Sequence, residues 1–319
     1  MTQFRTTFSI KPLNKKLSYS DAILMMGSCF TQNIGNKLKN LLFDILVNPY
    51  GILYNPLSLE NAISEIIDNK IYTQNDLIFF NSKYHSLNHH GDFSNTDLET
   101  CLIDINSTIN KSNIFFEKTR YVFLTLGTST VYFDITNDKA VGNCHKMPSD
   151  KFYSKRLTLE ETTNSLENIV NMLKENMDDP IICFTVSPIR HFRDGAIENK
   201  LSKATLLLAI DLIIQNHPDI YYFPAYEIVN DDLRDYRFYA DDMQHPNNLA
   251  LNYIWELFKN NCINDSCFEA MIAIDKLITA MNHKVTDTNT EEYIKYLNYI
   301  KTKQNEIEEL YPFVPKKFW

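Results

Sequence analysis

Ser28 stands where the sequence predicts a turn from a strand into a helix, a position that suits a nucleophile. An apolar run ends at Gly27, and apolar residues then recur at helical spacing from Ile34 to Leu42. Main-chain N–H groups at the start of such a helix can stabilise an oxyanion that forms beside the hydroxyl. From the local sequence alone, Ser28 could equally be only the N-cap of the helix.

An acid and an imidazole occur together near the other end of the chain. Asp242 precedes His245 by three residues, just ahead of Asn247, a plausible N-cap for the next helix. A carboxylate that holds one imidazole nitrogen leaves the other free to deprotonate a serine. Such a spacing also arises by chance in solvated loops, but the pair combined with Ser28 is a stronger signal than either part.

Two further groups of polar residues could contribute to a site. Arg190 and His191 follow the expected strand 181–186, so they should emerge at the same sheet edge as Ser28 and could bind a carbonyl or an anionic group. The alternative for Arg190 is an ion pair with Asp194. The other group consists of three histidines and an acid: His85, His89, His90 and Asp92.

These histidines could be read as zinc ligands, which would give a metallohydrolase. Adjacent His89 and His90 cannot both point the same way on an extended strand, so we expect them to line a pocket and we predict no metal site. The hypothesis is that His85 or His90 reaches into the pocket from a roof above the sheet edge.

The elements that must position these residues alternate between short β-rich runs and longer segments of helical period. This pattern predicts an α/β fold, with a parallel sheet covered by helices on both faces. Thr158 to Glu161 form a capping box before an apolar helical stripe. The expected strands are 23–26, 44–47, 121–126, 181–186 and 221–223.

Two regions depart from the alternation. Residues 71–118 look like an insertion after the second strand, with a hairpin about Asn81 and Ser82. Residues 263–319 look like a helical C-terminal extension, with helices at 275–281 and 291–310. The main domain would then span residues 1–262.

Composition and charge exclude several classes of protein. The chain has 319 residues, 44% of them hydrophobic, and a net charge of −9, so wholesale disorder and a nucleic-acid partner are not expected. The first twenty residues hold no signal-peptide core, and the apolar stretch 206–214 is interrupted by Asp211, so we expect a cytoplasmic protein without a membrane partner. The six cysteines include no C-x-x-C pair, and we expect mostly buried thiols.

A string of short motifs, in order, resembles the GSCFA family, a branch of the SGNH or GDSL-like hydrolase superfamily. The resemblance covers nearly all of residues 1–262. The motifs are Gly27-Ser28-Cys29-Phe30, Asn48 to Pro56, His85-Ser86 with His89-His90, Leu126-Gly127-Thr128, Asn143 to Lys146, Thr185 to His191 and Asp242 to Pro246.

The resemblance implies a three-layer, flavodoxin-like α/β/α fold with Ser28 as nucleophile, His245 as base and Asp242 as its partner. It also implies an oxyanion hole built from the N–H groups of Ser28 and Gly51 and an Asn side chain. This chain departs from the family at that Asn, because Ser129 stands there.

Another donor is then needed, and Thr128, Ser129 and Asn143 are the candidates, with Asn143 also expected to contact substrate. Thr31, where the motif has Ala, is expected to be a minor surface change. With Ser28 as nucleophile, Cys29 should point into the packing between helix and sheet.

The resulting hypothesis is a serine-dependent ester hydrolase that removes an acyl or acetyl group from a small-molecule or carbohydrate ester, without a cofactor. The alternative is a catalytically weak or inactive SGNH-fold module that binds glycan or acyl groups. The sequence does not indicate the acyl group, the alcohol or the oligomeric state.

Overall fold

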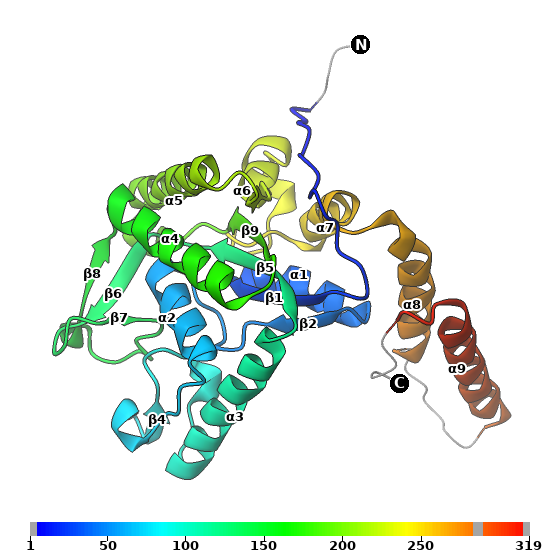
Figure 1. Cartoon of the computed structure of the whole chain (residues 1–319), viewed down its shortest axis with the longest axis horizontal. Helices are drawn as coiled ribbons and strands as arrows, with labels where there is room; N and C mark the ends of the chain where they lie inside the picture. The colour runs from blue at the N-terminus through cyan, green and yellow to red at the C-terminus, as the bar shows by residue number, and fades with distance from the viewer. Residues whose placement is uncertain (1–4, 283–289, 315–319) are drawn as a thin grey trace.

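A parallel five-stranded sheet forms the centre of the structure, a computed structural model that describes residues 5–282 and 290–314 (Figure 1). The strand order is β10-β9-β5-β1-β2, and every neighbouring pair is parallel. The order changes direction between β1 and β5, which in open α/β sheets is the usual place for a ligand site. The strands are β1 (Ala22–Gly27), β2 (Asp44–Val47), β5 (Thr119–Leu126), β9 (Ile181–Val186) and β10 (Tyr221–Tyr222).

Helices cover both faces of this sheet, as the sequence predicted. Ile23 and Met25 of β1 join one buried cluster, whereas Leu24 and Met26 join the other, because successive strand residues point to opposite faces. The first cluster includes α1 (Cys29–Asn40), α7 (Asn248–Cys262) and α8 (Phe268–Met281). The second includes α2 (Pro56–Ile67), α3 (Leu98–Phe116), α4 (Leu159–Asn176) and α5 (Ala196–Asn216).

Side-chain caps fix where the helices begin. Thr158 and Glu161 form the predicted capping box at the start of α4, and the Asn247 side chain accepts the N–H of Ala250 at the start of α7. The second of these caps sets the position of the loop that carries Asp242 and His245.

Residues 71–118, whose status as an insertion stays a prediction, contain the predicted hairpin and a helix that the sequence did not indicate. Strands β3 (Ile78–Phe80) and β4 (Lys83–His85) pair antiparallel about Asn81 and Ser82, and α3 follows. A second small sheet, also not predicted, lies between β5 and α4. Its antiparallel strands are β6 (Thr130–Asp134), β7 (Ala140–Val141) and β8 (Phe152–Arg156).

Short turns complete the connections. A one-turn helix α6 (Ala225–Glu227) continues into a π-helical segment, Ile228–Asp232. Single 3₁₀ turns occupy Gln74–Asp76, Gly91–Phe93, Ser149–Lys151, Phe192–Asp194, Tyr236–Phe238 and Asp265–Cys267.

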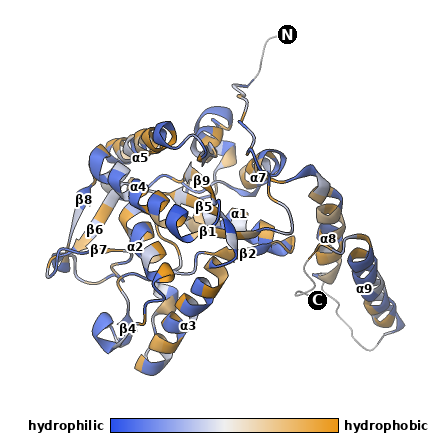
Figure 2. Cartoon of the chain, in the orientation of Figure 1, coloured by the Kyte–Doolittle hydropathy of each residue, from blue (hydrophilic) through white to orange (hydrophobic). Residues whose placement is uncertain are grey.

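The C-terminal segment is helical, as expected. Helix α9 (Glu291–Leu310) coincides with the prediction, whereas α8 begins seven residues before the predicted helix. The two helices lie side by side, with α9 on the outer side of α8 (Figure 1), and α9 presents a largely hydrophilic surface (Figure 2). The described helices include none with the length and apolar character that a membrane crossing requires. The separation of residues 263–319 from the main domain stays a prediction.

Candidate active site

The turn between β1 and α1 lies at the carboxyl edge of the sheet and is held tightly against β5. Gly27 has a φ of +136°, and a Cβ there would lie 2.2 Å from the Thr125 carbonyl oxygen, so only glycine fits. The Gly27 N–H donates to Asn48 Oδ1, and its carbonyl accepts the N–H of Leu53. These bonds fix the position of the two residues that follow Gly27.

Ser28 caps α1 from a fully buried position. Its Oγ accepts the N–H of Phe30 at 3.3 Å, and its own N–H donates to the Thr125 carbonyl at 3.2 Å. The N-cap role that the sequence left open is therefore present. The nucleophilic role of Ser28 stays a prediction, and the burial of the hydroxyl does not favour it.

Cys29 faces the histidine. Its Sγ lies 3.7 Å from Nε2 of His245, and the residue is partly exposed. The expectation that Cys29 points into the packing between helix and sheet is therefore wrong. Burial raises the pKa of the Cys29 thiol, whereas the main-chain N–H groups of Cys29 and Phe30 and the charge of Lys203 lower it.

Asp242 and His245 form a hydrogen-bonded pair in the loop before α7. Nδ1 of His245 lies 2.5 Å from Asp242 Oδ2, while Asp242 Oδ1 accepts the N–H groups of Gln244 and His245 at 2.9 Å. These main-chain bonds, with the His245 side chain, lower the pKa of Asp242 to about 2. Because an ionised carboxylate accepts the Nδ1 proton, the lone pair of Nε2 points toward Cys29.

The Gly51 amide is already used. It donates to the Asn48 carbonyl at 2.7 Å, so the predicted oxyanion donor is occupied. Glycine is needed at this position for another reason: its φ is +74°, and a Cβ would lie 2.1 Å from that of His90.

The residues that follow β5 also have partners. Ser202 of α5 lies 3.0 Å from Thr128 Oγ1 and accepts both the N–H and the hydroxyl of Ser129, which is fully buried. Asn143 accepts the N–H of His145. These hydrogen bonds make Thr128, Ser129 and Asn143 poor substitutes for the family's oxyanion asparagine, and their roles at the site stay predictions.

Thr31 is not a surface residue, contrary to the expectation. Its side chain is fully buried, and Oγ1 donates to Thr125 Oγ1 at 2.6 Å. The hydroxyl therefore joins the first turn of α1 to β5.

His191 lies beside the turn with one ring nitrogen unused. Its ring contacts Tyr54 edge-on at 5.1 Å, and its buried Nε2 has no hydrogen-bond partner within residues 5–282 and 290–314. Burial, with the charges of Lys203 and His245, lowers the pKa of His191 to about 4, so the imidazole is neutral near pH 7.

Arg190 binds Asn230, a partner that the sequence did not predict. Its Nη2 donates to Asn230 Oδ1 at 3.0 Å, and its guanidinium lies 5.9 Å from the centre of the Tyr239 ring. The side chain of Asp194, the alternative partner, lies outside the described part of the chain.

Lys203, on the buried face of α5, is not among the site residues predicted from the sequence. Its Nζ donates to the Gly127 carbonyl at 2.6 Å and to the Ser187 carbonyl at 2.7 Å. The available signal was its place three residues before Leu206, where it extends the apolar stripe of α5 toward the start of the helix.

The histidines of the insertion have partners within it. His85 contacts the Phe80 carbonyl through Nε2 and Ser94 Oγ through Nδ1, and His90 Nδ1 lies 3.0 Å from Asp92 Oδ2. None of these contacts reaches Cys29 or His245. The pocket-lining roles of His85, His89 and His90 therefore stay predictions.

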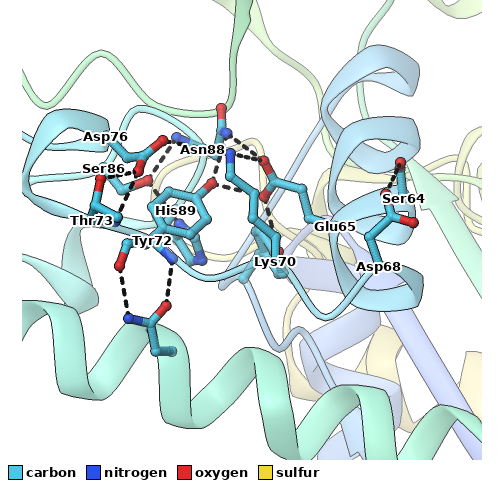
Figure 3. A network of polar contacts seen from close by, with 12 residues as sticks. Ser64, Glu65, Asp68, Lys70, Tyr72, Thr73, Asp76, Ser86, Asn88 and His89 are labelled. Atoms are coloured by element: carbon cyan, nitrogen blue, oxygen red, sulfur yellow. Dashed lines mark hydrogen bonds and ion pairs between the residues drawn. The ribbon is translucent and has the colours of Figure 1, made fainter.

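His89 belongs to a buried network, drawn in Figure 3. It stacks on Tyr50 at 4.2 Å between ring centres. Its Nδ1 lies 2.8 Å from Ser86 Oγ (Figure 3). Nearby, the buried Glu65 accepts hydrogen bonds from Tyr50, Tyr72, Lys70 and Asn88. The contacts shown are those of a packed polar core, and the described residues include no cluster of His, Cys, Asp or Glu arranged to hold a metal ion.

Comparison with curated proteins gave no significant match. The sequence model of the GSCFA family matches residues 22–258, which include the turn at Gly27 and the Asp242–His245 pair. Since the match spans well over half of the chain, this protein belongs to the GSCFA family.

Proposed function

We propose that this protein hydrolyses an ester bond through a thiol nucleophile, with Cys29 attacking, His245 as the base and Asp242 orienting the base. The observation that carries the proposal is the contact between Cys29 Sγ and His245 Nε2, with Asp242 on the other ring nitrogen. A nucleophile, a base and an orienting carboxylate in this order are the parts of a catalytic triad. The parallel sheet and the site at the carboxyl end of β1 support an SGNH-like hydrolase fold.

The reaction proceeds in two halves. His245 Nε2 takes the thiol proton as Sγ bonds to the substrate carbonyl carbon, and the carbonyl oxygen becomes an oxyanion. When the oxyanion collapses, the carbon–oxygen bond to the alcohol breaks and His245 protonates the leaving alkoxide. Water then attacks the Cys29 thioester and gives a proton to His245. The carbon–sulfur bond breaks, the acid leaves, and the Cys29 thiolate takes the proton back from His245.

Two groups are suited to stabilise the oxyanion. The N–H of Cys29 is the first of α1, at the positive end of the helix dipole, and it already favours negative charge on the sulfur. The neutral His191 ring has a buried Nε2 with no hydrogen-bond partner among the described residues, and this nitrogen lies next to Gly127 at the end of β5. These replace Gly51, whose amide is occupied.

A thiol suits this position better than the neighbouring hydroxyl. Ser28 is fully buried and uses its Oγ to cap α1, whereas Cys29 is partly exposed beside the base. The site is open to solvent on the other side, because about half of the His245 side chain is exposed. We propose small-molecule or carbohydrate-linked esters as the substrate class.

The alternative is an SGNH-fold module that binds glycan or acyl groups without turnover. The hydrogen bonds that occupy Thr128 and Ser129 favour it, because they remove two candidate oxyanion donors. Turnover that depends on Cys29 would exclude this alternative.

A panel of acyl esters of rising chain length, acyl thioesters and acetylated sugars tests the proposal. The wild-type protein should hydrolyse at least one class, and Cys29→Ala and His245→Ala should each lose about 100-fold or more in kcat/KM. Cys144→Ala, which removes the other partly exposed cysteine, is the matched control and should keep the wild-type rate. No hydrolysis by the wild type, or full activity in Cys29→Ala, would contradict the proposal.

A further inference from the structure

Lys203 has a buried amine beneath the site, with contacts that are unusual for a lysine. The residue is 1% exposed, and its two hydrogen bonds go to main-chain carbonyls, those of Gly127 after β5 and Ser187 after β9. Among residues 5–282 and 290–314, no carboxylate forms an ion pair with it. Burying a charge without a counter-charge costs free energy of folding, so we expect Lys203 to have a function at this position.

We propose that Lys203 is a positioning residue for the reaction: it joins the ends of β5 and β9 under the site and supplies the positive charge that favours the Cys29 thiolate. The inference rests on the proposed role of Cys29 as nucleophile. It goes beyond that role, because it names the group that would make the thiol reactive.

The geometry of the two carbonyls supports the first part. Gly127 donates its N–H to the Tyr54 carbonyl, and a Cβ on Gly127 would lie 3.2 Å from His191 Nε2, so this segment forms one wall of the site. Lys203 holds the carbonyl side of the same residue. The ammonium therefore fixes the backbone that His191 and Tyr54 contact.

The electrostatics support the second part. The titratable groups that face Lys203 are Cys29 from α1, His191 after β9, and Tyr226 of α6, whose ring centre lies 5.8 Å from Nζ. Burial lowers the pKa of Lys203 to about 7, and a negative Cys29 raises it. The positive charge of Lys203 in turn lowers the pKa of Cys29, against the larger effect of burial, which raises it.

The pH dependence of Cys29 alkylation by iodoacetamide tests this coupling without requiring turnover. In Lys203→Met, the rate at neutral pH should fall about tenfold and the profile should shift to higher pH, because the thiolate loses its cation. Lys200→Met removes a positive charge from the exposed side of the same helix and should leave the profile unchanged. Cys29 is followed by peptide mapping, so that the other thiols do not contribute.

A second measurement keeps the proposal testable should Lys203→Met fail to fold. NMR titration of the protein with 13C-labelled lysines follows the Lys203 amine in wild type and in Cys29→Ala. Removing the sulfur should shift the Lys203 titration to lower pH, since the thiolate no longer stabilises the ammonium.

The results separate this inference from the proposed function. An unchanged alkylation profile in Lys203→Met, or an unchanged Lys203 titration in Cys29→Ala, would overturn the coupling even for an active hydrolase. A shifted profile in a protein that hydrolyses no ester would support the coupling and contradict the proposed function.

Discussion

Cys29 Sγ and His245 Nε2 lie 3.7 Å apart although the two residues are 216 positions apart in the chain. The contact joins the first turn of α1 to the loop before α7, and Asp242 completes it at 2.5 Å on the far side of the ring. Because α1 and α7 pack in the same hydrophobic cluster, the fold holds Cys29 and His245 next to each other.

Replacing His245 should abolish most of the activity while leaving the fold intact. The side chain is about half exposed, so His245→Ala should change the thermal midpoint little, whereas kcat should fall about 100-fold or more because no base remains for the thiol. His217→Ala, at a histidine paired with Glu167 away from the site, is the control. Steady-state kinetics with the best ester substrate would measure kcat for both variants. A wild-type rate in His245→Ala would show that another group is the base.

Asp242→Asn should lower kcat by about 10-fold to 1,000-fold, because an amide no longer fixes the Nδ1 proton that leaves Nε2 free to accept. The loss should come from the missing hydrogen bond and not from the removal of a negative charge. Asp241→Asn removes the charge of the neighbouring exposed acid and should behave as wild type, so it is the control. Equal rates for the two variants would contradict the orienting role of Asp242.

Gly27→Ala should destabilise the protein by about 3 kcal/mol or more, because the added Cβ would meet the Thr125 carbonyl at 2.2 Å and φ is +136°. Gly91→Ala is the matched control, since a Cβ there meets no atom within 4 Å. Denaturant midpoints would measure the difference. Similar midpoints for the two variants would contradict the tight packing of the β1–α1 turn on β5.

The stability of the protein should fall as the pH falls below about 6.5, and His89 should contribute to the loss. Burial lowers the pKa of His89 from 6.5 to about 3 in the folded protein. As the pH falls from 6.5 toward 3, the unfolded chain binds a proton that the folded protein does not bind, so the free energy of unfolding decreases. His89→Phe keeps the stacking on Tyr50 without the titration, and should lose less free energy of unfolding between pH 7 and pH 5. A loss as large as in wild type would contradict this role.

The fold could be predicted largely from its buried strands. The five central strands are short apolar runs bounded by turn residues, and the capping residues Thr158 and Asn247 mark two helix starts by their type alone. Helix α3 was missed because apolar residues also occur off its buried stripe, at the exposed Ile103 and Ile114, and they obscure the helical period. Strands β6 to β8 are partly exposed and lack the continuous apolar runs of the central sheet.

The location of the site was predictable from the sequence, but the side chain that faces His245 was not. The sequence places Ser28 and Cys29 at the same turn, and which of them faces the histidine depends on where the helix begins, a boundary that a pattern fixes only to within a residue or two. Once Ser28 is the N-cap, Cys29 begins α1 and its side chain faces His245. The occupied amide of Gly51 could not be foreseen either, since it depends on the left-handed conformation of Asn48 and on the turn that this residue starts.

The identity of the acylated residue tests the central claim most directly. The protein is mixed with a rapidly acylating ester and quenched in acid, and the acyl group is located by mass spectrometry of the digested chain. The proposed mechanism predicts a thioester on Cys29 that neutral hydroxylamine removes, absent in Cys29→Ala and present in Ser28→Ala. An acyl group on the oxygen of Ser28, retained in Cys29→Ala, would contradict it and make the protein a serine hydrolase.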